Sequence, residues 1–123
     1  MSKNINQVLI VSDAGRLRDS LRVLLKSCYP LSIIVEAETS LAALQLLAGS
    51  SRTLVLLDAA LPDGQAWQAL AQIGKRFSQA QCVVLTHSLE HQEQAESAGV
   101  VAVGLDGFTV ENLSAALEAG AHD

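Results

Sequence analysis

Aromatic residues are scarce in this sequence. One Trp, one Tyr and two Phe occur among 123 residues, although half of the residues are hydrophobic. The core of the folded protein must therefore be built mainly from aliphatic side chains. A chain of this length is expected to form one domain, residues 1–123, with a substantial core.

Positive charge is scarce as well. Eight Lys and Arg stand against thirteen Asp and Glu, which gives a formal net charge of −5. Binding to nucleic acid generally requires a basic face that neutralises phosphate groups. We therefore expect this chain to make no direct contact with nucleic acid.

Long apolar runs are missing. No run approaches the roughly 18–20 residues of a membrane span, and the N-terminal MSKNINQ is too polar for a signal peptide. The two cysteines, Cys28 and Cys82, lie far apart within apolar patterns, which predicts two reduced core thiols. These features predict a cytoplasmic protein without membrane contact.

Short apolar runs alternate along the chain with amphipathic segments. The runs are rich in Val, Ile and Leu and are mostly continuous, which is typical of strands buried on both faces of a parallel sheet. The five expected strands are QVLIVS (7–12), SIIVEA (32–37), TLVLLD (53–58), QCVVLT (81–86) and VVAVGL (100–105).

Helices are expected after each strand. Residues 89–98 are polar almost all round and predict an exposed, weakly held helix that stops at Gly99. The last helix is expected between Thr109, as its N-cap, and Gly120. The first three helices are indicated by apolar stripes at helical spacing. These stripes are Leu17, Leu21, Leu24, Leu25 and Cys28; Leu41, Leu44 and Leu47; and Trp67, Leu70, Ile73 and Phe77.

Alternation of five strands with five helices predicts an α/β fold. The expected architecture is a three-layer, flavodoxin-like (βα)5 fold, in which a five-stranded parallel sheet carries helices on both faces. In such folds, ligands and reactive groups gather beyond the carboxyl ends of the strands.

Polar residues stand at four of these strand ends. Strands one, three and four should be neighbours, so that their terminal side chains converge. Converging carboxylates repel one another, and a hard cation such as Mg²⁺ or Ca²⁺ relieves that repulsion. The pattern therefore predicts a metal site formed by acids. The polar residues are Ser12, Asp13, Asp58, Thr86, His87 and Asp106.

Four segments together resemble the response regulator receiver domain of two-component signalling, over residues 7–119. VLIVSDAGRLRDSLRVLLKS is similar to the family's first strand and helix, and LLDAALPDG to its phosphoacceptor strand and loop. VVLTHS resembles the fourth strand with its hydroxyl residue, and AGVVAVGLDGFTVENL the fifth strand and last helix. Four motifs in order at the right spacing identify the chain as an atypical member.

The resemblance implies a role for each site residue. Asp58 would accept a phosphoryl group from a histidine kinase or phosphotransfer protein, and Thr86 would turn inward to contact that group. Mg²⁺ would be held by Asp13, Asp58 and the backbone carbonyl of Ala60, with Asp106 as a further candidate. Phosphoryl transfer needs a nucleophile, a cation and hydrogen-bond donors. The chain would catalyse only its own phosphorylation and is not expected to be an enzyme.

The sequence departs from the family pattern at the end of the fifth strand. There the family has lysine followed by proline, whereas this chain has Asp106 and Gly107. The lysine ammonium neutralises phosphoryl charge. A phosphorylated Asp58 would instead carry a charge of about −1.5 to −2 beside further acids. Arg16 is the nearest cation expected from the sequence.

Three smaller departures point the same way. Ser12 replaces the first acid of the family's pair and removes a ligand for a metal-bound water. His87 stands where the family generally has a small residue; it narrows access to Asp58 and offers a proton-dependent positive charge. Val103 occupies the position of the family's switch aromatic. Together these residues predict a degenerate receiver that takes phosphate inefficiently.

Two other functions stay open. A pseudo-receiver would use the same fold as a phosphorylation-independent interaction or dimerisation module. In either case an output domain or partner protein would dock on the face of the fifth strand and last helix. A small metal-dependent hydrolase using Asp13, Asp58 and Asp106 is a remote alternative, because the sequence shows no DxD nucleophile–acid motif, no candidate base beyond His87 and no substrate-binding insertion. Nucleotide binding is disfavoured, since no GxGxxG loop follows the first strand.

Overall fold

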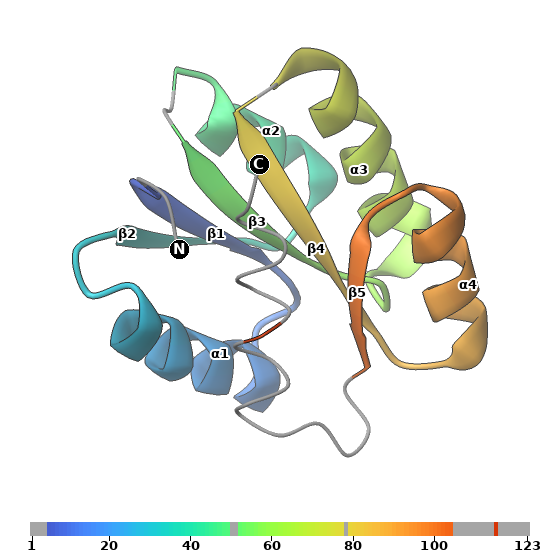
Figure 1. Ribbon diagram of the computed structural model, residues 1–123, viewed down its shortest axis with the longest axis horizontal. Coiled ribbons are helices and arrows are strands. Elements are labelled where there is room, and N and C mark those ends of the chain that lie inside the picture. Colours follow the sequence, from blue (N-terminus) through green and yellow to red (C-terminus); the bar gives the residue numbers. More distant parts are fainter. Residues whose placement is uncertain (1–4, 50–51, 78, 105–114, 116–123) are drawn as a thin grey trace.

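The computed structural model describes residues 5–49, 52–77, 79–104 and 115. A five-stranded parallel sheet lies between helices (Figure 1). The strands are β1 (Gln7–Val11), β2 (Ile33–Ala37), β3 (Thr53–Asp58), β4 (Ala80–Thr86) and β5 (Val101–Gly104). The α-helices are α1 (Arg16–Cys28), α2 (Ser40–Leu47), α3 (Gln65–Arg76) and α4 (Leu89–Ser97), and a 3₁₀ turn, η1, covers Pro62–Gly64.

The order of the strands in the sheet is β2-β1-β3-β4-β5, and all neighbouring pairs are parallel. This confirms the predicted five-stranded α/β architecture. The strand order reverses next to β1, so the carboxyl ends of β1, β3 and β4 lie side by side, where α/β folds place their sites. The predicted last helix, from Thr109 to Gly120, falls almost wholly outside the described residues.

Strand β3 runs through the middle of the protein, and all six of its residues are buried. Its side chains alternate between the two faces of the sheet. Leu54 and Leu56 belong to the hydrophobic cluster that includes α1. Val55 and Leu57 belong to the opposite cluster. The unbroken apolar run in the sequence is therefore explained by burial on both faces.

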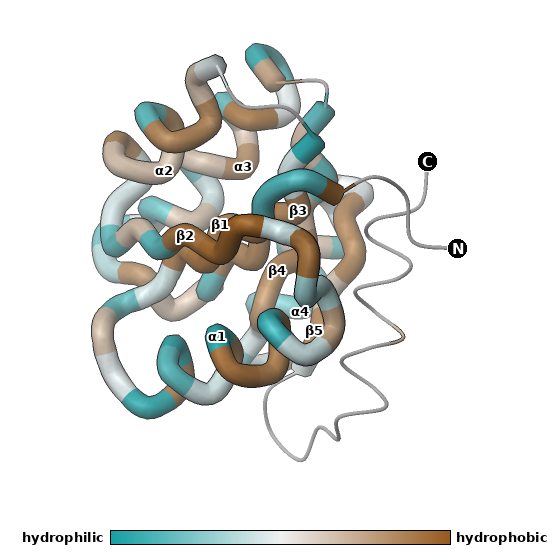
Figure 2. The backbone as a smooth tube through the Cα atoms, turned by 90° about the vertical axis from the view of Figure 1, so that its left-hand side faces the viewer, coloured by the Kyte–Doolittle hydropathy of each residue, from teal (hydrophilic) through white to brown (hydrophobic). Residues whose placement is uncertain are grey.

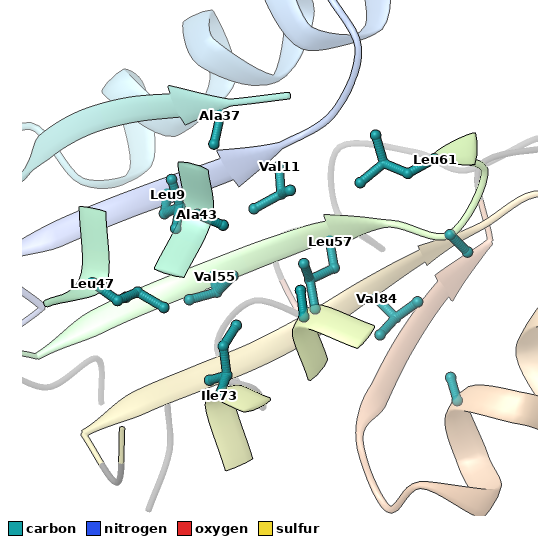
Figure 3. Close-up of a cluster of buried hydrophobic side chains, with 13 residues drawn as sticks. Leu9, Val11, Ala37, Ala43, Leu47, Val55, Leu57, Leu61, Ile73 and Val84 are labelled. Atoms are coloured by element: carbon teal, nitrogen blue, oxygen red, sulfur yellow. The ribbon is translucent and has the colours of Figure 1, made fainter. Parts of the chain in front are cut away.

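The four described α-helices lie on both faces of the sheet. Helix α1 covers one face and packs Leu21 and Leu25 against the sheet. Helices α2, α3 and α4 cover the other face, where Ala43, Ile73 and Ala95 are buried. Figure 2 shows the hydrophobic strands running between the helical layers, and Figure 3 shows the aliphatic cluster under α2 and α3.

Two expectations about burial are wrong. Cys28 is exposed, because it is the last residue of α1, and the following Tyr29 is buried instead. Leu41 is 66 % exposed. The buried face of α2 is formed by Ala43 and Leu47, four residues apart, and Leu41 lies about 200° around the helix from Ala43.

The second cysteine lies within β4 and is partly buried. Burial raises the pKa of the Cys82 thiol from 9.0 to about 12. Cys82 is therefore almost entirely protonated near neutral pH, which makes it a poor nucleophile.

Helix α4 is exposed along most of its length, as its polar sequence predicts, with Ala95 as its one buried residue. Ser88 caps its first turn by accepting a hydrogen bond from the backbone amide of His91. Gly99 follows the helix with a φ of 76°, a left-handed conformation that glycine adopts without strain. Within the described part of the chain, every helix falls short of the length and apolar character that a membrane crossing requires.

Candidate functional site

Asp58 ends the central strand and is 7 % exposed. It is the only Asp, Glu, Lys or Arg buried to this degree among the described residues. The chain turns immediately afterwards: the Ala59 amide donates to the carbonyl of Leu85, and the Leu61 amide donates to the carbonyl of Asp58. Leu61 is itself buried and anchors the loop (Figure 3). The strand before Asp58 and the turn after it therefore fix the position of this residue.

Three segments contact the Asp58 carboxylate. The backbone amide of Ala60 donates to Oδ1 over 2.9 Å. The Nε2 atom of His87, in the loop after β4, lies 2.7 Å from the same oxygen. The Ser12 hydroxyl, just after β1, donates to Oδ2 over 3.1 Å. Because a carboxylate offers only acceptors, the imidazole nitrogen is the donor in its contact.

The backbone of His87 is held by helix α4. Its amide donates to Nδ1 of His91 over 3.2 Å, and the two rings meet edge to face with centroids 6.0 Å apart. His91 also lies 6.4 Å, centroid to centroid, from Trp67 of α3. A line of three rings therefore leads from Asp58 to the contact between α3 and α4.

Thr86 is buried, and its hydroxyl donates to the backbone carbonyl of Val103 over 3.2 Å. In this state the hydroxyl is therefore committed to strand β5. Val103, at the predicted switch position, is buried as well. Gly104, the register partner of Thr86, is exposed. Asp106 and Gly107 lie outside the described residues.

Arg18 is a residue near the site that sequence reasoning missed. Its Nη1 donates to the Ser12 carbonyl over 3.3 Å and pairs with Glu38 over 3.1 Å. Its Nε lies 3.3 Å from Glu36 Oε1, an ion-pair distance without hydrogen-bond geometry. Arg16, the cation expected from the sequence, is exposed. Arg18 thus supports the backbone of the residue that contacts Asp58.

A second arginine extends this ionic cluster. Arg22, one helical turn after Arg18, donates to Glu36 over 2.8 Å and pairs with Asp19 over 3.2 Å. The hydrogen bond to Glu36, and then its negative charge, raise the pKa of the Arg22 guanidinium. The sequence signal was present: two arginines four residues apart on one helix face, and an acid within the second strand.

In this arrangement, Oδ1 of Asp58 has no acceptor position left for a resident Mg²⁺. Mg²⁺ is usually bound through one or two carboxylates and several waters, and Asp13 is exposed beside the site. Each carboxylate oxygen has about two acceptor positions. Both positions on Asp58 Oδ1 are taken, by Ala60 and His87. In the described part of the chain, no three His, Cys, Asp or Glu side chains are grouped to hold a metal.

One acceptor position of the Asp58 carboxylate remains open, and it lies on Oδ2. Ser12 occupies one of the two positions on that oxygen. The other can accept a further donor, or can attack an electrophile such as phosphorus. Ser12 directly follows β1 and Thr86 ends β4, and these two strands flank β3 in the sheet. A carboxylate with hydroxyl donors nearby supplies a nucleophile and hydrogen-bond donors, which are two of the three features that phosphoryl transfer needs.

Several solved structures share this fold. A putative response regulator from Chloroflexus aurantiacus J-10-fl is 15% identical, with a TM-score of 0.82, and the alignment covers 96% of this chain and 98% of that one. The signal receiver domain of an HD domain-containing protein from Pseudomonas fluorescens Pf-5 is 24% identical, with a TM-score of 0.76 over 95% and 94%. A CheY-like receiver domain from Methanospirillum hungatei JF-1 is 20% identical, with a TM-score of 0.76 over 96% and 94%.

The sequence itself also matches a family. No curated protein matches the chain. The model of the response regulator receiver domain, however, matches residues 8–118, which is most of the sequence. With the parallel sheet in the order β2-β1-β3-β4-β5 and the buried acid at the end of β3, this chain belongs to the response regulator receiver domain family.

Proposed function

We propose that this receiver domain takes up a phosphoryl group on Asp58, from a histidine kinase or a phosphotransfer protein of a two-component pathway. The observation that carries the proposal is the place of Asp58. It is a buried acid at the carboxyl end of the central strand, in contact with residues that follow β1 and β4. Receiver domains are generally not enzymes, and here the phosphoryl group ends on the chain itself.

In the proposed reaction, Oδ2 of Asp58 attacks the phosphorus of the donor. A new oxygen–phosphorus bond forms as the bond from phosphorus to the donor's nitrogen or oxygen breaks, and the donor leaves with that electron pair. The Ser12 hydroxyl, which already contacts Oδ2, donates to a phosphoryl oxygen. Thr86 does the same once it turns away from the Val103 carbonyl. Both contacts stabilise charge that develops in the transition state.

The transfer is proposed to be inefficient. Phosphorylated Asp58 would carry a charge of about −1.5 to −2. Ser12 supplies a neutral hydroxyl where the family has an acid that helps to bind a cation, and Asp106 places an acid where the family has its lysine. Arg18 is already paired with Glu36 and Glu38. The phosphoryl charge would therefore be only partly neutralised.

The state of Thr86 would be passed on through strand β5. Its hydroxyl binds the carbonyl of Val103, so a turn toward a phosphoryl group breaks a contact between β4 and β5. An output domain or a partner protein docked on β5 and the segment that follows would detect this change. Because Val103 is not aromatic, transmission of the phosphorylation signal would have to depend on the hydrogen bond between the Thr86 hydroxyl and the Val103 carbonyl.

A pseudo-receiver is the second candidate function. It is favoured by the Asp58 carboxylate, which has three of its roughly four acceptor positions filled by the protein's own donors. In that case the domain would bind its partner, or a second copy of itself, without phosphorylation.

Incubation with acetyl phosphate and Mg²⁺, followed by intact-mass measurement, separates the two functions. We expect a species heavier by one phosphoryl group, which accumulates more slowly than in a conventional receiver treated in parallel. If the conventional receiver is labelled and this chain remains unmodified after prolonged incubation, phosphoacceptance is wrong and the pseudo-receiver is supported.

A further inference from the structure

We propose that His87 is a latch on Asp58: its imidazole occupies the acceptor position on Oδ1 that a divalent cation would use, so that the cation and the latch exclude each other. The inference deepens the proposed function, because it concerns access to the same carboxylate. It nevertheless stands on its own geometry, which is the 2.7 Å contact between His87 Nε2 and Asp58 Oδ1.

Both acceptor positions of Asp58 Oδ1 are filled. The amide of Ala60 takes one acceptor position of this oxygen, and that amide is fixed by the turn after β3. The imidazole of His87 takes the other. A cation can therefore reach Oδ1 only if the imidazole leaves. If the cation binds Oδ2 instead, it competes with the phosphoryl group for the one position left there.

The imidazole of His87 can rotate toward solvent. The side chain of His87 is 35% exposed, whereas that of Asp58 is 10% exposed. The backbone of His87 stays in place through its amide, which is bound to His91, and through the Ser88 cap of α4. Rotation of one side chain toward solvent thus opens the carboxylate without moving the helix. Opening of the latch therefore involves only the side chain of His87.

Trp67 is placed to report the movement of His87. Trp67 is the only tryptophan of the chain. It lies 6.4 Å from His91, whose ring meets that of His87 at 6.0 Å, centroid to centroid. Release of His87 from Asp58 moves the ring that meets His91 edge to face. The fluorescence of Trp67 should therefore report opening of the latch, whether or not a phosphoryl group is transferred.

The test compares wild type with His87→Ala at one fixed pH. Mg²⁺ and Mn²⁺ are titrated separately into both proteins and followed by calorimetry, and labelling by acetyl phosphate is followed by intact mass. Trp67 fluorescence is followed in wild type, where release of His87 supplies the signal. We expect His87→Ala to bind the metal alone about tenfold more tightly and to be labelled about tenfold faster. A competing hydrogen bond to a charged group typically has an effect of this size. Gln92→Ala, an exposed change on α4, should alter neither quantity.

The outcomes distinguish the latch from the proposed function. Tighter metal binding by His87→Ala, with labelling absent from both proteins, supports the latch and contradicts phosphoacceptance. Labelling of both proteins at one rate, with equal metal affinity, overturns the latch and leaves phosphoacceptance intact. His87→Ser provides a second removal of the imidazole that keeps a polar side chain at this exposed position, and it should behave as His87→Ala does.

Discussion

Replacing Asp58 with asparagine is expected to abolish phosphoryl labelling while the domain stays folded. The amide lacks the nucleophilic carboxylate oxygen, so no acyl phosphate can form at this position. The shape of the side chain is retained, and the amide oxygen still accepts from the Ala60 backbone. The free energy of unfolding should therefore change by only about 1 kcal/mol. Intact mass after treatment with acetyl phosphate measures the first effect, and urea denaturation measures the second.

Asp63→Asn is the matched control for this substitution. Asp63 is an exposed acid in the same loop, and its φ of 61° suits asparagine. The control should be labelled as wild type is, because only the charge of a neighbouring acid is removed. A labelled Asp58→Asn protein would show that the phosphoryl group goes to another residue, and the proposed acceptor would then be wrong.

Replacing Leu56 with alanine is expected to lower the free energy of unfolding by about 2–5 kcal/mol, because removal of a buried leucine leaves a cavity as well as lost apolar contacts. Leu56 is fully buried in the central strand, paired in register with Ile10 on one side and Val83 on the other. Domains of this kind are stabilised by only about 5–15 kcal/mol in total. Urea denaturation of the purified variant measures the loss.

Val23→Ala is the control for the core substitution. Val23 lies on α1 and is 68% exposed, so its truncation should change the free energy of unfolding by less than about 0.5 kcal/mol. If the two variants lose stability equally, β3 is not the centre of the core. The positions assigned to the site residues at its end would then be unsupported.

The fold was predictable because burial on two faces leaves a strong mark on a sequence. The continuous run LVLL of β3 indicated a central strand, and the alternation with helices indicated a parallel sheet. Packing at the ends of helices was less predictable. Cys28 continues the apolar stripe of α1 yet is exposed, because the helix ends at this residue and the following Tyr29 is buried instead.

The candidate site was predictable as a set of strand ends, but its contacts were not. The sequence placed Ser12, Asp58, Thr86 and His87 at one edge of the sheet. It did not reveal that Ser12 and His87 would bind the carboxylate directly, or that Thr86 would bind the backbone of Val103 instead. These choices depend on side-chain rotations of a few ångströms, which residue spacing does not encode.

The arginines of α1 show the same difference between position in the sequence and contact in the structure. Position along the chain favoured Arg16, at the start of the first helix, as the cation nearest to the site. Helical rotation instead turns Arg18 toward the end of β1, where it binds the Ser12 carbonyl and pairs with Glu38. A residue that faces solvent and one that supports the site differ here by two positions, or about 200° around the helix.

The most direct test of the account is to locate the phosphoryl group. Wild-type protein treated with acetyl phosphate and Mg²⁺ is reduced with borohydride, which converts an acyl phosphate of aspartate into the corresponding alcohol, and is then digested and sequenced by mass spectrometry. We expect one reduced residue, at position 58, and a larger reduced fraction in His87→Ala. Reduction at another acid, or at none while a conventional receiver is modified in parallel, would contradict it.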